Sequence, residues 1–251
     1  MNTFAIILYI AAIVSRHKYL LLVLGGLAAT LHALVLYQGL ITPTGLNLGF
    51  FNAASLIAWV IVVLLLLSLP HQPVKNLAIV LFPLAALAIG LQGYFQTERI
   101  FSSETEIGVT LHILASILAY SLLSISALQA LFLALQDYQL HHKHPGWVMQ
   151  RLPPLQVMEK LFFQMITVGF GLLSLSLISG LVFLDDLFAQ HLAHKTVLST
   201  MAWCIFAILL WGHWRYGWRG KTAIRWNLTG FAALMLAYFG SKLVLELILH
   251  R

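Results

Sequence analysis

Eight apolar runs, separated by short polar gaps, dominate this sequence. Most approach the length of about 20 residues that an α-helix needs to cross a bilayer, although the first is shorter. We place the runs at about residues 3–15, 19–40, 47–69, 74–94, 107–136, 160–184, 196–214 and 224–249. The pattern predicts an all-α, polytopic integral membrane bundle of about eight transmembrane helices, with residues 1–251 forming a single domain.

The composition excludes a water-soluble globule. Hydrophobic residues make up 61% of the chain and charged residues only 9%, which is too few polar side chains to cover a soluble surface. The net charge of +6 does not indicate nucleic-acid binding, because the basic residues lie in the short gaps and not on one face. We therefore expect membrane lipid as a partner and no nucleic acid. A single cysteine, Cys204, excludes a disulfide within the chain.

Lysines and arginines are distributed unevenly between alternate gaps. Ten fall on one side of the predicted membrane and four on the other. Because these residues accumulate in cytoplasmic loops, the split predicts that both termini lie outside, away from the cytoplasm. The longest loop, at about residues 137–159, is then cytoplasmic. Its four helix-breaking residues predict a link between two halves rather than a domain: Pro145, Gly146, Pro153 and Pro154.

Two histidines, His32 and His112, fall inside apolar runs at similar expected depths. His32 lies about eight residues before the outer end of the second run, or about 12 Å below it. His112 lies about five residues into the fifth run, or about 8 Å deep. Two imidazoles at one level on different helices can hold a haem iron from opposite sides. The alternative is that each bonds to a backbone carbonyl or a serine on a neighbouring helix.

The remaining ionisable residues are weaker candidates. His194 lies at the outer mouth before the seventh run, either as a plain loop histidine or within reach of a haem edge. Lys242 lies four residues before Glu246, and its ammonium either snorkels to the interface or meets a haem propionate. We expect most other histidines to be solvated. The stretch Trp211–Trp226 has the pattern of an aromatic belt, whose arginines can hold lipid phosphate.

The C-terminal stretch, residues 193–244, resembles the signature of the cytochrome c assembly family of haem-handling membrane proteins. The order of its features carries the resemblance: a lysine at the outer mouth, a tryptophan in the helix, then WRG and a closing YFG. Two further stretches fit, NLGFFNAASLIAWVI at 47–61 and GVTLHILASILAYSLLSISALQALFLALQ at 108–136. The family has a histidine at the position of His112. In its compact eight-helix branch, a histidine in the second helix, here His32, is also typical.

The resemblance implies a multi-pass protein of the bacterial inner membrane that binds haem b, with His32 and His112 as axial ligands. It implies a role in haem handling, haem transport or cytochrome c maturation, with other cytochrome-maturation or membrane proteins as partners, and it does not require an enzyme. The outer loop Asp185–Lys195 reads DDLFAQHLAHK and lacks the family's tryptophan-rich WWD segment, so direct ligation of haem to cytochrome c is not expected.

Two other classes of function stay open. The first is a haem-free accessory or regulatory subunit of another membrane complex that keeps the family fold. The second is a secondary transporter of another small solute. The sequence shows no paired broken helices and few buried carboxylates for ion coupling, which argues against a transporter.

Overall fold

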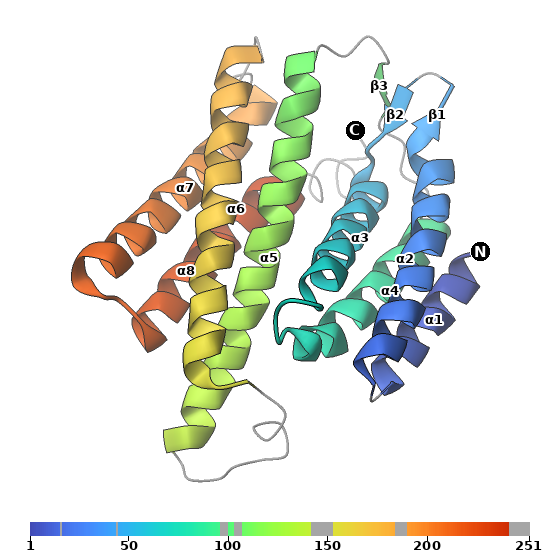
Figure 1. Cartoon of the computed structure of the whole chain (residues 1–251). Coiled ribbons are helices and arrows are strands. Elements are labelled where there is room, and N and C mark those ends of the chain that lie inside the picture. Colours follow the sequence, from blue (N-terminus) through green and yellow to red (C-terminus); the bar gives the residue numbers. More distant parts are fainter. Residues whose placement is uncertain are drawn as a thin grey trace. The chain divides into compact units, whose positions relative to one another are not determined.

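The computed structural model describes residues 1–15, 17–43, 45–95, 100–102, 107–141, 153–183 and 190–240. Eight α-helices lie within these ranges (Figure 1). Six helical segments in the described ranges are long and apolar enough to span a membrane, so the predicted all-α polytopic class is confirmed. The helices are Asn2–Val14 (α1), Lys18–Leu40 (α2), Phe50–Ser68 (α3), Ala78–Tyr94 (α4), Ile107–His141 (α5), Leu155–Phe183 (α6), Gln190–Tyr216 (α7) and Gly220–Met235 (α8).

Two helices gain length from irregular turns. A 3-10 turn, η1 (Lys75–Leu77), precedes α4 and completes an apolar segment of 20 residues. The 16-residue helix α8 continues into a π-helical segment, η3 (Leu236–Gly240). Helix α1 has 13 residues, in agreement with the short first run. A helix pairs its own backbone N–H and C=O groups. Apolar segments in lipid require this, because the hydrocarbon core offers those groups no other partner.

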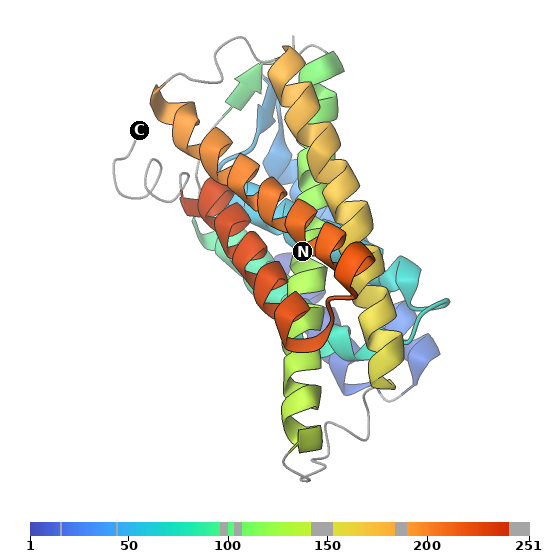
Figure 2. The same ribbon diagram turned by 90° about the vertical axis from the view of Figure 1, so that its left-hand side faces the viewer.

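The described residues divide into a first unit within Met1–Thr105 and a second within Glu106–Ile248. In the first unit, α1 and α3 each pack against both α2 and α4, so that the four helices form a closed ring. In the second unit, α5 and α7 each pack against both α6 and α8 in the same way (Figure 2). Each helix therefore buries one stripe inside a four-helix bundle. The expectation of a single domain over residues 1–251 stays a prediction.

Helices α5 and α6 form the longest antiparallel pair, and polar side chains of α5 fix its register. Gln129 Nε2–H donates to the Met158 carbonyl at 3.3 Å, and Gln136 Nε2–H donates to the Pro153 carbonyl at 3.1 Å. Moving along α5 from Gln129 toward its C-terminus therefore leads back along the partner segment from Met158 to the residues just before α6, as an antiparallel pair requires. The glutamine amides are buried, and such bonds offset the cost of placing them in an apolar setting.

The link between α5 and α6 is shorter at both ends than the predicted loop of residues 137–159. Helix α5 continues to His141, and α6 already begins at Leu155. Pro153 and Pro154 do not interrupt helix here, because they lie just before α6, where a missing backbone N–H leaves no bond unmade. The Pro154 carbonyl accepts hydrogen bonds from the amides of Val157 and Met158, at 3.0 and 3.2 Å.

A small antiparallel sheet, which the sequence did not predict, lies in the first unit. Its strands are β1 (Ile41–Thr42), β2 (Gly45–Asn47) and β3 (Ile100–Ser102), in the order β1-β2-β3. Leu46 of β2 pairs with Ile41 on one side and with Phe101 on the other. The sheet thereby joins the connection after α2 to the connection after α4.

Close packing between α5 and α6 predicts different effects for two glycines of α6. A Cβ at Gly169 would lie 2.9 Å from both Cγ and Cδ2 of Leu123, whereas a Cβ at Gly171 would meet nothing within 4 Å. We expect Gly169→Val to lower the free energy of unfolding by about 1–3 kcal/mol more than Gly171→Val does. Thermal unfolding in detergent measures the difference. Equal losses would contradict this packing, because both variants share the same cost in helix propensity.

Candidate functional site

His112 lies five residues after the start of α5 and faces α6. Its Nδ1–H donates to the backbone carbonyl oxygen of Ser176, at 2.8 Å. Because a carbonyl oxygen only accepts, Nδ1 carries the proton, and Nε2 of the neutral ring keeps its lone pair. The described residues offer Nε2 no hydrogen bond, and the side chain is half-buried. This is the tautomer and orientation that metal-binding histidines adopt.

Serine hydroxyls of α5 and α6 surround this bond. Ser116 Oγ–H donates to the carbonyl of His112 at 2.7 Å, and the Ser176 hydroxyl lies 2.6 Å from Ser116 Oγ. Ser179 Oγ–H also donates to the Ser176 carbonyl, at 3.0 Å. Each hydroxyl finds an acceptor within the helix pair, as interhelical polar contacts in membranes require. The cluster fixes α5 against α6 at the level of His112.

The second unit also places a cation in reach of His112, and that cation lies over an aromatic ring. Lys195 of α7 lies within electrostatic range of His112, and its Nζ lies 5.3 Å from the centre of the Tyr238 ring. Tyr238 and Phe239 belong to η3, and their ring centres lie 5.8 and 5.6 Å from that of Tyr120 on α5. A histidine with a nitrogen open to coordination, a positive charge and aromatic rings therefore occur in one part of this unit.

His32 is held differently, inside the first unit. Its side chain is 0% exposed. Nδ1 lies 3.1 Å from the hydroxyl of Tyr9 on α1, and Nε2 lies 2.8 Å from the hydroxyl of Ser55 on α3. One ring nitrogen donates and the other accepts, so both are engaged. Coordination of iron through Nε2 would require the Ser55 hydroxyl to rotate away.

The expected pairing of the two histidines stays a prediction. His32 lies eight residues before the end of α2 and His112 five residues after the start of α5, which are the positions along each helix that the sequence indicated. The two rings belong to different units. His194 lies in α7, but its side chain is outside the described residues, as is the whole of Lys242.

Both histidines make the kind of contact expected on the alternative reading of the sequence, a backbone carbonyl for His112 and a serine for His32, but the particular partners were not identified from the sequence. Tyr9 and Ser55 lie 23 residues from His32 on either side, and no local pattern indicates that distance. A signal did exist for the serine cluster. Ser116 follows His112 by one helical turn, and Ser176 precedes Ser179 by three residues, so both pairs lie on one helix face.

Trp203 and His213 of α7 anchor that helix to α6. Trp203 Nε1–H donates to the Ser174 hydroxyl at 2.8 Å. His213, near the end of α7, is not one of the solvated histidines, because its Nδ1–H donates to the Trp218 carbonyl at 2.8 Å. Its ring stacks on Phe163, with 3.5 Å between centroids.

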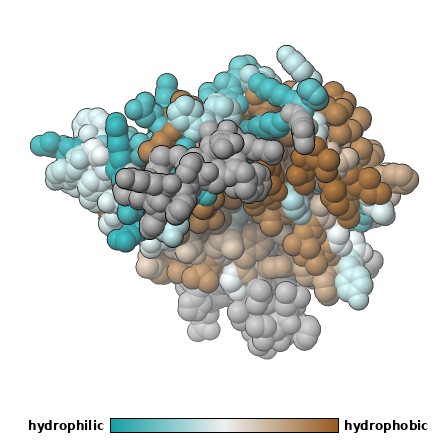
Figure 3. Space-filling view, turned by 90° about the horizontal axis from the view of Figure 1, so that it is seen from below, coloured by the Kyte–Doolittle hydropathy of each residue, from teal (hydrophilic) through white to brown (hydrophobic). Residues whose placement is uncertain are grey.

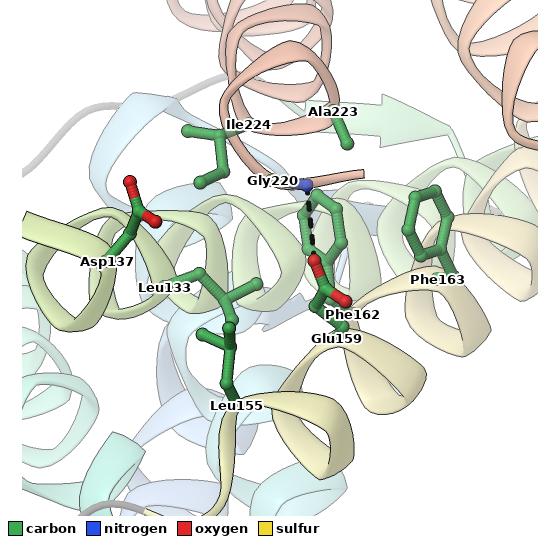
Figure 4. A pocket seen from close by; sticks show the side chains of 9 residues that line it. All are labelled: Leu133, Asp137, Leu155, Glu159, Phe162, Phe163, Gly220, Ala223 and Ile224. Carbon is green, nitrogen blue, oxygen red and sulfur yellow. Dashed lines mark hydrogen bonds between the residues drawn. The ribbon is translucent and has the colours of Figure 1, made fainter. Parts of the chain in front are cut away.

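A mostly apolar hollow lies in the second unit, at the end of α5 and α6 remote from His112 (Figure 4). Two carboxylates line it. Glu159 accepts a hydrogen bond from the backbone N–H of Gly220 at 3.1 Å, which places a negative charge at the N-terminus of α8. Asp137 forms an ion pair with Lys221 at 3.8 Å. Both carboxylates thus hold α8 against α5 and α6.

The fold and these sites define a multi-pass helical membrane protein in which His32 in the first unit and His112 in the second are hydrogen-bonded to a neighbouring helix. Comparison with known proteins identifies its relatives. A family model described as cytochrome c assembly protein matches residues 20–249. The chain is 35% identical to the inner membrane protein YpjD of Escherichia coli K12 over 221 residues, which cover 88% of this chain and 82% of that protein.

Two further relatives are less similar to the chain. The protein HemX of Brevibacillus brevis is 24% identical over 131 residues, covering 51% of this chain and 48% of that protein. The cytochrome c biogenesis protein CcsA of Trichodesmium erythraeum is 27% identical over 97 residues, covering 38% and 28%. No solved structure matches the chain. The chain belongs to the cytochrome c assembly protein family and is a multi-pass inner-membrane protein, which confirms the resemblance and the location predicted from the sequence.

The contrast between the two histidines predicts unequal effects on stability. In protein prepared without haem, we expect His32→Ala to lower the free energy of unfolding by about 2–4 kcal/mol, because it removes a fully buried ring and leaves two hydroxyls without a partner. His112→Ala removes a half-buried ring with one hydrogen bond, and we expect a loss of about 1 kcal/mol. Chemical unfolding in detergent measures both. A larger loss for His112→Ala would contradict the described burial.

Proposed function

We propose that the protein binds haem b, with Nε2 of His112 as an axial ligand to the iron, and that it handles haem during cytochrome c maturation. The supporting observation is the hydrogen bond from Nδ1 of His112 to the Ser176 carbonyl, which leaves Nε2 as the nitrogen with a lone pair. A type b haem fits the chain, because a single cysteine excludes the C-x-x-C-H motif that attaches haem covalently.

His32 is the proposed second axial ligand. Its support is its depth along α2 and the neutral imidazole held between two hydroxyls. Rotation of the Ser55 side chain about its Cα–Cβ bond would move the hydroxyl oxygen away from Nε2, while Tyr9 would keep Nδ1 in place. Bound haem would supply the iron for axial ligation, and the chain would supply the two imidazoles and an apolar enclosure.

Positive side chains are the proposed partners of the haem propionates. Lys195 has the support of its positive charge and of its position within electrostatic range of His112. His194 and Lys242 stay candidates from their sequence positions, His194 for the haem edge and Lys242 for a propionate. Relatives named for cytochrome c biogenesis support the wider role in maturation, and we propose no catalytic residue.

A haem-free accessory subunit is the second candidate function. One observation favours it, namely that both nitrogens of His32 are already engaged by protein hydroxyls. The outer loop without tryptophan agrees with this reading. On this alternative the two histidines serve only to join helices.

Absorption spectroscopy of protein purified in mild detergent from haem-replete cells tests the proposal. We expect a haem absorption band in the wild type and a fall of about tenfold or more, per folded protein, in His112→Ala, since an axial bond is lost. The matched control is His71→Ala, which removes an exposed histidine of the first unit and should leave the band unchanged. A colourless wild type would favour the accessory subunit.

Ser55→Ala separates the two roles of His32. If His32 is an iron ligand, His32→Ala weakens the band, whereas Ser55→Ala keeps it, because only a hydroxyl that competes with iron is removed. If His32 only joins helices, both variants lower stability and neither changes the haem bound per folded protein. The second pattern would overturn the assignment of His32 while leaving that of His112 intact.

A further inference from the structure

The turn between α7 and α8 is fixed by aromatic stacking. The Trp218 ring lies between those of Tyr216 and Trp226, at 6.4 and 5.7 Å between centroids and within 30° of parallel to each. The same ring covers Gly212, where a Cβ would overlap it. Glycine at that position is therefore required for the stack to form.

Backbone contacts hold the same turn from both helices. Gly217 adopts a left-handed conformation, with φ of +67°, and its N–H donates to the His213 carbonyl at 3.0 Å. Gly220 is also left-handed, with φ of +54°, and Glu159 of α6 accepts its N–H. Glycine adopts this conformation without steric cost. The turn is thus a fixed surface and not a loose connection.

Four basic side chains surround this turn, and all four are exposed: Arg215, Arg219, Lys221 and Arg225. Lys221 pairs with Asp137, and the Arg215 guanidinium lies 5.9 Å from the centre of the Tyr216 ring. Within the described part of the chain, Arg219 and Arg225 form no ion pair. Helices α7 and α8 lie on the left in Figure 1, and the left edge of Figure 3 shows hydrophilic residues gathered there. The turn therefore carries positive charge that the described residues neutralise only at Lys221.

Large apolar side chains are exposed beside these cations. Trp214 is 83% exposed and Trp211 is 54% exposed. Farther along α7, Ile208 and Met201 are also exposed, as expected for a helix that faces lipid. Tryptophans at this position mark the level of the lipid headgroups. The cations are thus placed where phosphates of the membrane lie.

We propose that Arg215, Arg219 and Arg225 around this turn bind the phosphate of an anionic phospholipid. Guanidinium groups match phosphate geometry with paired hydrogen bonds, and the tryptophans contact the adjoining acyl chains. A free phosphate has the same charge but no apolar part, so the exposed tryptophans favour the lipid. The positive-inside prediction places this turn in the cytoplasmic leaflet, where anionic lipids attract basic segments.

Native mass spectrometry of the detergent-solubilised full chain with added phosphatidylglycerol or phosphatidylcholine tests the proposal. We expect the wild type to retain phosphatidylglycerol preferentially. Each of Arg219→Gln and Arg225→Gln should weaken that binding about fivefold. Lys160→Gln is the matched control, because it removes an exposed cation of α6 in the same unit, and it should change binding less than twofold.

Two further measurements distinguish a structured lipid-binding site from nonspecific attraction of the lipid by positive charge. Gly212→Ala keeps every charge but displaces Trp218, and it should weaken phosphatidylglycerol binding as the arginine variants do. If this variant does not fold, Trp218→Leu provides the same test. An equal loss in Lys160→Gln, full retention in the Trp218 variant, or displacement of the lipid by inorganic phosphate at similar concentration would each overturn the proposal.

Discussion

The hydrogen bond from Nδ1 of His112 to the Ser176 carbonyl is the interaction on which the candidate site depends. An imidazole in an apolar bundle must satisfy its N–H, and here the neighbouring helix provides the acceptor. That one bond also decides the tautomer and therefore which nitrogen can bind iron. The serine cluster then holds both helices at this level, so that the orientation of the ring follows from the α5 and α6 packing.

Hydrogen bonds of the same kind have different consequences in the two units. In the second unit, one nitrogen of His112 is engaged, and the cation Lys195 lies within electrostatic range. In the first unit, hydroxyls of Tyr9 and Ser55 engage both nitrogens of His32. Two histidines at similar expected depths therefore differ in whether a ring nitrogen is available to coordinate a metal. The family model matches segments of both units, whereas these local contacts distinguish the two residues.

The sequence predicted the helices well because lipid imposes a length and an apolar composition on every span. It predicted α2 as residues 19–40, against Lys18–Leu40 in the structure. It did not predict that α5 continues to His141 or that α6 begins directly after Pro154, because those ends depend on bonds such as that from Gln136 to Pro153. For the site, the sequence identified the histidines but not their partners. Contacts such as Ser55 with His32 join distant segments and leave no local pattern.

A structure of the haem-loaded protein determined by electron cryomicroscopy tests the central claim most directly. The account predicts iron bonded to Nε2 of His112, with Nδ1 still donating to the Ser176 carbonyl. Haem bound elsewhere in the chain, with the His112 ring free of iron, would contradict it.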